Sequence, residues 1–245
     1  MNYNEYQLTV LDNLKCLAAS LAISGMVSFL FYDSLWGMVV FPAIMIFLRK
    51  SIRNNVIATR KEKLSQQFLD GLRAISTALL AGYSVENAWK EAQNEIGLLY
   101  GEDNYMYMEL EEMNRCVEMN VPLELRMNDF AYRSGVEDIE SFAEIFSFAK
   151  RSGGDFVHII DSTTNRMCEK YETRREIEVL IASKKLEQKV MNVIPLGILA
   201  YLKLTSMDYL SVLYGNLFGV FFMTVCLILY GFAMVLSEKV LEIQV

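Results

Sequence analysis

The stretch CLAASLAISGMVSFLFY, residues 16–32, contains no charged side chain, and Asp33 is the only charge between it and Arg49. A helix needs about 20 apolar residues, each rising about 1.5 Å, to cross the hydrocarbon core of a membrane. The uncharged region is too long for one crossing, and Asp33-Ser34 offers a turn near its middle. The region therefore predicts a transmembrane hairpin over residues 16–48.

A second apolar region lies near the C-terminus, where Lys203 and Asp208 are the only charges between residues 190 and 236. It predicts a second transmembrane hairpin over residues 190–236. The inner two of the four spans are short, because Ser34–Leu48 has 15 uncharged residues and Val190–Leu202 has 13. We expect the third span to reach full length by extending the ammonium group of Lys203 outward to the far interface.

Charged residues concentrate between the two hairpins. Residues 49–189 hold 20 of the 23 Lys and Arg residues and 24 of the 30 Asp and Glu residues. The hydrophobic fraction of 53% is therefore the average of two apolar regions and one polar domain. The excess of acidic over basic side chains in this domain argues against binding to nucleic acid.

The basic residues near the span ends predict the orientation in the membrane. They gather just after the first hairpin and just before the second, whereas the two short turns contribute only Lys203. Such clusters are typical of the cytoplasmic side. We therefore expect a multi-pass protein of the cell (inner) membrane with a cytoplasmic N-terminal segment (1–15), a main cytoplasmic domain (49–189) and a cytoplasmic tail (237–245). The residues before the first span include two acids beside Lys15, which argues against a cleaved signal peptide.

Apolar residues in the middle domain recur at helical spacing. Phe68, Leu72, Ile75 and Leu79 form one stripe, and two further stripes run over residues 85–96 and 139–149. A final stripe begins at Phe156 and runs into the third span without a break. The sequence therefore predicts an all-α fold, with a cytoplasmic antiparallel helical bundle between the two transmembrane hairpins.

Three short segments between these stripes have the composition of helix–helix turns. Each one pairs residues that tolerate a positive φ with residues that begin a helix. The residues that we assign to the turns are Gly82 and Ser84, then Asn120 and Pro122, then Gly153, Gly154 and Asp155. Three such turns in succession are typical of an antiparallel bundle.

The three turns resemble those of the type II secretion system F domain, the core of platform proteins in secretion and type IV pilus machines. The family's small-Gly-x-polar turn matches Ala81-Gly82-Tyr83-Ser84, its Gly-Val-Pro-Leu-Glu turn matches residues 120–124, and its Gly-Gly-Asn/Asp turn matches residues 153–155. The resemblance covers the chain from about Leu64 to the C-terminus. Since one such domain lies between two hairpins, the chain is similar to the platform proteins of Tad-type (Flp) pilus assembly.

This chain departs from the family pattern at three positions. Asn120 replaces the family's Gly, Leu125 stands where Ala is commoner, and the polar His158 follows the double Gly. Asn also tolerates a positive φ, so we expect the second turn to persist.

The resemblance implies a function and a set of partners. The implied function is a platform that couples a cytoplasmic secretion ATPase to the assembly of pilin-like subunits in the lipid bilayer. It also implies an oligomer, formed with further copies of the chain or with a paralogous platform protein. The resemblance leaves open whether the machine secretes proteins or builds a pilus, and which pilin it handles.

The sequence offers no pattern typical of catalysis. His158 is the only histidine, and Asp161 follows it three residues later, but no nucleophile accompanies them. The sequence contains no Gly-x-x-x-x-Gly-Lys-Ser/Thr phosphate loop. Its four cysteines have no CxxC spacing and are typical of free thiols. We therefore expect a chain that is not an enzyme, with no cofactor and no catalytic or metal-binding residue.

Two other classes of function compete with the platform. A transporter is disfavoured because the charges of the apolar regions lie at their turns rather than within the spans. A membrane-tethered helical signalling or adaptor protein remains the alternative, since it would share this topology.

An acidic segment lies between the first two turns. Glu109, Glu111 and Glu112 lie close together there, and Arg115 is the only basic residue nearby. One interpretation is a solvated helix face that keeps the domain soluble. The other is a docking surface for a basic patch on the ATPase, with Glu109 and Glu112 on one helical face.

Overall fold

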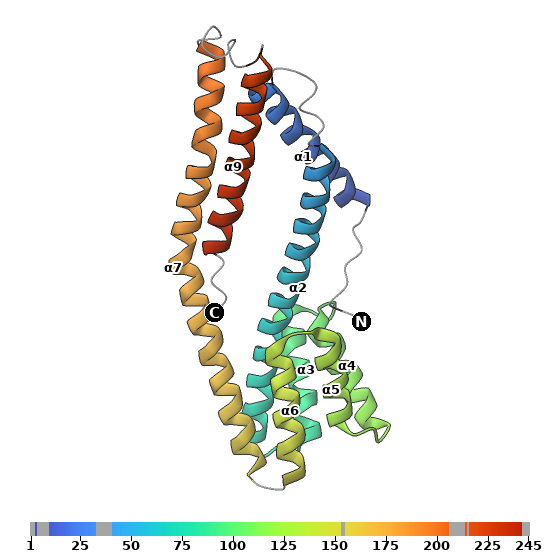
Figure 1. Ribbon diagram of the computed structural model, residues 1–245. Helices are drawn as coiled ribbons and strands as arrows, with labels where there is room; N and C mark the ends of the chain where they lie inside the picture. The colour runs from blue at the N-terminus through green and yellow to red at the C-terminus, as the bar shows by residue number, and fades with distance from the viewer. Residues whose placement is uncertain are drawn as a thin grey trace. The chain divides into compact units, whose positions relative to one another are not determined.

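The computed structural model describes Tyr3 and residues 10–32, 41–152, 155–205, 214 and 216–241. Its described residues contain helices and turns but no strand, which confirms the predicted all-α class. In chain order the elements are α1 (Val10–Val27), the π-helical turn η1 (Ser28–Tyr32), α2 (Phe41–Leu80), α3 (Val85–Tyr100), α4 (Tyr105–Glu118), α5 (Leu123–Ser134), α6 (Glu137–Ser152), α7 (Phe156–Thr205) and α9 (Leu217–Leu241) (Figure 1).

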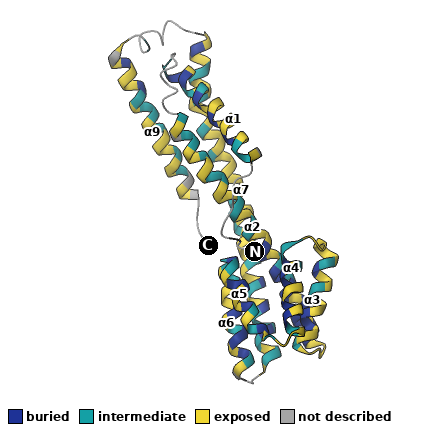
Figure 2. Cartoon of the chain, turned by 90° about the vertical axis from the view of Figure 1, so that its right-hand side faces the viewer, coloured by how far each residue is buried: buried dark blue, intermediate teal, exposed yellow. Residues whose placement is uncertain are grey.

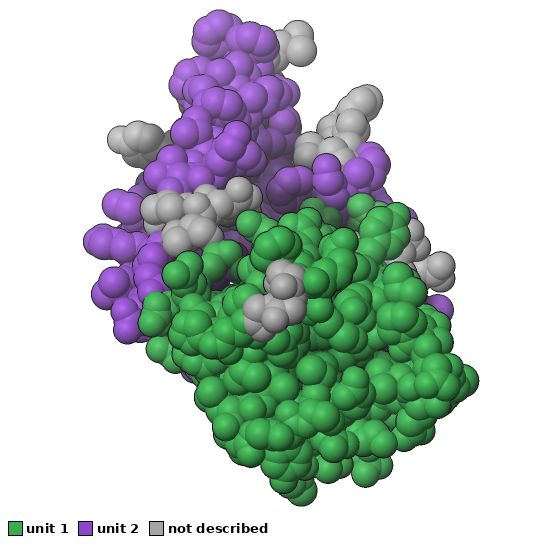
Figure 3. All heavy atoms as spheres, turned by 90° about the horizontal axis from the view of Figure 1, so that it is seen from below, with its two compact units in different colours: residues 1–7, 53–172 green, residues 8–52, 173–245 purple. Residues whose placement is uncertain are grey.

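The chain divides into two compact units (Figure 3). Unit 1 consists of residues 1–7 and 53–172, and unit 2 of residues 8–52 and 173–245. Long helices α2 and α7 contribute residues to both units. Unit 1 is shorter than the domain expected over residues 49–189, and it takes in the first seven residues of the chain.

Unit 1 is a bundle in which α3, α4, α5 and α6 pack against one another in succession (Figure 1). The stripe from Phe68 to Leu79 is buried, as are Trp89 and Ile96 on α3 and Phe142 on α6. Figure 2 shows buried residues in dark blue on the helices of the bundle. Burial of one face per helix is what the helical spacing of apolar residues predicts.

Aromatic rings fill the centre of the bundle. Phe142 lies 5.5 Å from Phe68 and 6.0 Å from Phe146, measured between ring centroids. Phe146 in turn lies 5.1 Å from the indole of Trp89. Glycine brings α3 close to α4, because a Cβ added at Gly97 would lie 3.0 Å from the ring of Tyr107.

Unit 2 is dominated by apolar helices that leave large hydrophobic side chains exposed. Among the described residues, two helical segments are long and apolar enough to cross a membrane: Asp12–Tyr32, with a mean hydropathy of 1.8, and Phe218–Ser237, with a mean hydropathy of 2.3. Only 11% of the Phe218–Ser237 segment is buried, and α9 accordingly has few buried positions in Figure 2. Leu30, Phe31 and Met223 form a small buried cluster within this unit.

Helix α7 continues from Phe156 to Thr205 and includes Pro195. The predicted continuity of the last stripe into residues 190–202 is therefore confirmed as a single helix. The predicted span Ser34–Leu48 begins outside the described residues, which resume at Phe41.

Candidate functional site

The first predicted turn, between α2 and α3, has Gly82 at φ 88°. A side chain strains the backbone in this region, and a Cβ at Gly82 would meet nothing within 4 Å, so conformation rather than space favours glycine there. Two residues later, Ser84 is the N-cap of α3, and its hydroxyl accepts a hydrogen bond from the backbone N–H of Asn87 at 3.3 Å. The turn thus ends α2 and begins α3 with local contacts.

The second turn, between α4 and α5, has the only non-glycine residue with a positive φ among those the structure describes, Asn120 at φ 59°. The backbone N–H of the next residue, Val121, donates to the carbonyl of Cys116 at 2.9 Å and so closes the end of α4. Pro122 is the N-cap of α5, directly before its first helical residue, Leu123.

The third turn joins α6 to α7, and Gly153 and Gly154 lie outside the described residues. Asp155 is described, and its carboxylate accepts a hydrogen bond from the backbone N–H of His158 at 3.2 Å. Asp155 therefore caps the N-terminus of α7.

The predicted acidic docking face needs a correction at Glu109. This residue is only 6% exposed and lies among Met106, Leu110 and Met113 on the buried face of α4. Glu109 follows Met106 by three residues and precedes Met113 by four, and this spacing places it on the same face of the helix as both methionines. The prediction that the Glu109 side chain is part of an exposed docking surface is therefore wrong.

The Glu109 carboxylate is satisfied inside unit 1. Both terminal nitrogens of Arg133 donate to it, at 2.8 and 2.6 Å, and the hydroxyl of Tyr3 donates to Oε1 at 2.8 Å. Arg133 also binds Asp129 through Nε at 2.8 Å. These contacts supply the buried carboxylate with hydrogen bonds in place of those that water would form.

The same contacts shift the ionisation of the groups around Glu109. Its hydrogen bonds raise the pKa of the Arg133 guanidinium despite partial burial. Burial, followed by the Glu109 charge, raises the pKa of the Tyr3 hydroxyl well above its usual range. Both side chains therefore keep their protons at any physiological pH.

Tyr3 is an anchor point for the N-terminal segment that sequence reasoning missed. The side chain is 1% exposed, and its ring packs edge-on against Tyr105 and Phe130, with centroids 5.6 and 6.5 Å away. Its backbone N–H donates to the carbonyl of Arg133 at 3.1 Å. No periodic pattern marks an isolated tyrosine so far from its partners in sequence.

The remaining acidic residues of α4 are at the surface. Glu111 and Glu112 are both exposed, and Glu112 pairs with Arg115 at 3.4 Å. Glu118, in the last turn, pairs with Lys90 of α3 at 2.8 Å, and this contact lowers the pKa of the Glu118 carboxyl. The candidate docking face therefore consists of Glu111 and Glu112.

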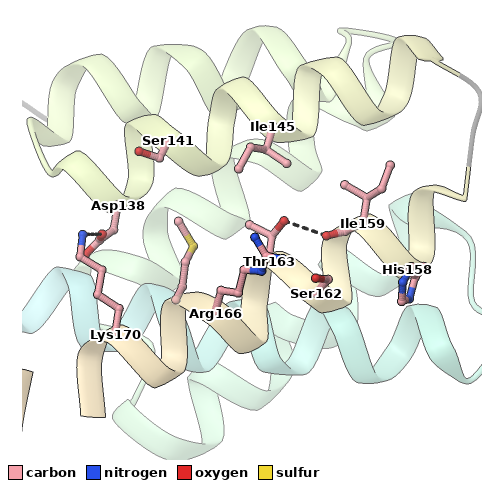
Figure 4. A pocket seen from close by; sticks show the side chains of 10 residues that line it. Asp138, Ser141, Ile145, His158, Ile159, Ser162, Thr163, Arg166 and Lys170 are labelled. Carbon is pink, nitrogen blue, oxygen red and sulfur yellow. Dashed lines mark hydrogen bonds and ion pairs between the residues drawn. The ribbon is translucent and has the colours of Figure 1, made fainter. Parts of the chain in front are cut away.

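A groove of about 420 Å³ runs between α6 and α7. Figure 4 shows Ser141 and Ile145 on the α6 side, and a longer series of side chains from His158 to Lys170 on α7. His158 and Asp161, which the sequence places three residues apart, have different surroundings in the structure. His158 is exposed at one end of the groove, whereas the Asp161 carboxylate accepts a hydrogen bond from Ser76 of α2 at 2.7 Å.

Lys203 is buried within unit 2, which corrects the expected outward extension of its ammonium group. Its Nζ donates to the carbonyl of Phe29 and lies 3.8 Å from the centroid of the Phe29 ring and 5.1 Å from that of Tyr214. A backbone carbonyl and two aromatic faces replace water around the cation.

Cysteine and metal chemistry add no site among the described residues. All four cysteines are free thiols, as expected, and no group of His, Cys, Asp and Glu within the described ranges is arranged to hold a metal ion. Cys168 is buried and its Sγ accepts a hydrogen bond from Nε of Arg73 at 3.1 Å. Burial nevertheless raises the pKa of this thiol, which disfavours a reactive thiolate.

The chain was also compared with known proteins by family model, by sequence and by structure. No family model, curated protein or solved structure matches it. The F-domain resemblance is therefore a prediction from the turn motifs and from the order of apolar and polar regions along the sequence.

Proposed function

We propose that the chain is a multi-pass membrane protein whose helical bundle and both chain ends lie on the cytoplasmic side. The observation that carries this proposal is the burial of Tyr3 in the same compact unit as residues 53–172. If the apolar segment Asp12–Tyr32 crosses the membrane, the chain must cross back before Arg53 to keep Tyr3 and the bundle together. The uncharged residues 34–48 are available for that return.

Charge supports the cytoplasmic assignment of the bundle. Arg49, Lys50 and Arg53 follow the first proposed hairpin, and Lys184, Lys185 and Lys189 precede the second. Short segments beside membrane spans carry such excess positive charge on the cytoplasmic side. For the second hairpin, the apolar end of α7 would cross first and Phe218–Ser237 would return.

Within this topology, the chain acts as a platform of a type II secretion or Tad-like pilus machine. It would connect a cytoplasmic secretion ATPase, which supplies the energy, to pilin-like subunits in the membrane. The support is a bundle whose turns have a positive φ at Gly82 and Asn120, at the positions of the F-domain motifs. Proteins of this kind position partners rather than perform chemistry, in keeping with the expectation that this chain is not an enzyme.

Reporter fusions test the topology. A reporter that is active only in the cytoplasm is expected to be active when inserted near Asp103 or fused after Val245, and inactive when inserted at Met207. The orientation follows from the basic residues beside the proposed spans. Activity at Met207 would show that residues 190–205 do not cross, and the four-span topology would be rejected.

Copurification with a secretion ATPase co-expressed with the full chain tests the platform function. The Glu111→Lys/Glu112→Lys variant is expected to lose most of the ATPase that wild type retains at low salt, because opposite charges across such a rim set the association rate. Raising the salt concentration is expected to weaken wild-type binding in the same direction.

A charge-matched variant, Glu62→Lys/Glu169→Lys, provides the control, since both glutamates are exposed on other helices of unit 1. It is expected to bind the ATPase like wild type. If the α4 variant also binds normally, Glu111 and Glu112 only solvate the surface. If wild type binds no secretion ATPase at all, the platform proposal fails and the membrane-tethered adaptor replaces it.

A further inference from the structure

The exposed face of α6 carries an acidic stripe. Glu137, Glu140 and Glu144 follow one another at spacings of three and four residues, which places them on one side of the helix. All three are exposed, and none of their carboxylates forms an ion pair within the described residues. This stripe therefore offers negative charge that the bundle itself leaves without a counter-ion.

The neighbouring face of α7 carries positive charge. Arg166 and Lys170 are one helical turn apart, and both line the groove. Lys170 pairs with Asp138 of α6 at 2.8 Å. Arg166 is exposed, and its guanidinium forms no ion pair with any residue that the structure describes.

The groove lies between α6 and α7, and Figure 4 shows side chains that line it, with Ser141 and Ile145 on α6 and Arg166 on α7. Ile145 of α6 and Ile159 and Met167 of α7 line it and are only half-buried. These apolar side chains would gain from being covered, since burial contributes about 25 cal/mol for each Å² of apolar surface removed from water.

The contact between Asp138 and Lys170 sets the relative level of the two helices. Because α6 and α7 are consecutive and antiparallel, four residues forward on α6 correspond to four residues back on α7. Arg166 therefore lies level with Phe142, between the levels of Glu140 and Glu144. The unpaired charges of opposite sign thus face outward at the same height on the two sides of one groove.

We propose that this face binds the same face of a second copy of the chain, around a two-fold axis that runs along the groove. A rotation about that axis preserves height and exchanges the two sides. It therefore places Arg166 of each copy opposite Glu140 and Glu144 of its partner copy. Helices α6 and α7 of both copies then form a four-helix arrangement, with the half-buried apolar residues of the two grooves at its centre.

The charges select this axis over the alternative. A two-fold axis running across the groove would place acid against acid and base against base, and directly opposed like charges are destabilising. The face spans about 24 Å along two neighbouring helices, each about 10 Å wide. An interface of that size lies at the small end of specific interfaces, so its opposite charges have a large relative effect.

Copurification of two differently tagged full-length chains, co-expressed and extracted in detergent, tests the proposal. Wild type is expected to recover its differently tagged copy. Arg166→Glu and Glu140→Lys, each expressed in both tagged forms, are expected to self-associate at least about tenfold more weakly. Symmetry makes each reversal create two repulsive contacts.

The decisive arm combines the two variants. When an Arg166→Glu chain is co-expressed with a Glu140→Lys chain, both contacts across the axis again join opposite charges. Recovery of the mixed pair is therefore expected to return to the wild-type level. A general loss of folding would not be repaired in this way.

Arg126→Glu, on α5 and outside the groove, makes the same change in charge and is expected to associate like wild type. The proposal is overturned if wild type recovers no second copy, or if Arg166→Glu associates with itself as tightly as wild type. It is also overturned if the mixed pair is recovered no better than either variant with itself.

Discussion

Replacing Arg133 with methionine is expected to lower the free energy of unfolding of unit 1 by about 3–5 kcal/mol. The substitution leaves the carboxylate of Glu109, whose side chain is 8% exposed, without its two hydrogen bonds from the guanidinium. Removing one partner of a buried ion pair leaves an uncompensated charge, which costs more than the pair itself contributes. Denaturant unfolding of the full chain in detergent, followed by tryptophan fluorescence, measures the change.

Two further variants identify the cause of that loss. Adding Glu109→Gln to Arg133→Met is expected to restore part of the stability, because the amide is neutral and its oxygen still accepts the hydrogen bond from Tyr3. Arg115→Met removes an arginine from an exposed pair with Glu112, and is expected to change the stability by less than about 1 kcal/mol. Equal effects of Arg133→Met and Arg115→Met would contradict the buried pair.

Replacing Phe146 with alanine is expected to destabilise unit 1 by about 3–5 kcal/mol. The ring is fully buried and contacts Trp89, Phe142 and Phe156, so its removal leaves a cavity among aromatic side chains that cannot collapse without moving helices. A loss of this size lowers the midpoint of thermal unfolding by at least about 10 °C in a domain of this size. Circular dichroism of the full chain in detergent records that midpoint.

A matched control lies two residues further along α6. Phe148 is 66% exposed, and Phe148→Ala is expected to change the free energy of unfolding by less than about 0.5 kcal/mol. Because both variants lose the same side chain from the same helix, the difference between them isolates burial. Similar midpoints for the two variants would show that the side of α6 that carries Phe146 is not the side packed against the other helices.

The sequence by itself determined the helical architecture of the bundle. The apolar stripe from Phe68 to Leu79 is buried as its spacing predicts, and Ser84 caps the helix that its position predicts. Such features are readable because they depend on local chemistry: helical periodicity sets which residues share a face, and φ preferences set where a helix ends. The apolar regions predicted four spans, and within the described residues two helical segments, Asp12–Tyr32 and Phe218–Ser237, are long and apolar enough to cross a membrane.

Only the tertiary structure decided which polar residues are inside. Glu109 shares its stripe with Met106 and Met113, so its burial had a signal in the sequence, but its charge outweighed that signal in the prediction of an exposed face. Its partners are distant in the sequence: Tyr3 lies 106 positions from Glu109, and Arg133 lies 24 positions from it. The residues next to Glu109 in the sequence do not indicate such distant partners. Burial of a charge is decided by whether distant groups can replace water around it, and that depends on how the helices pack.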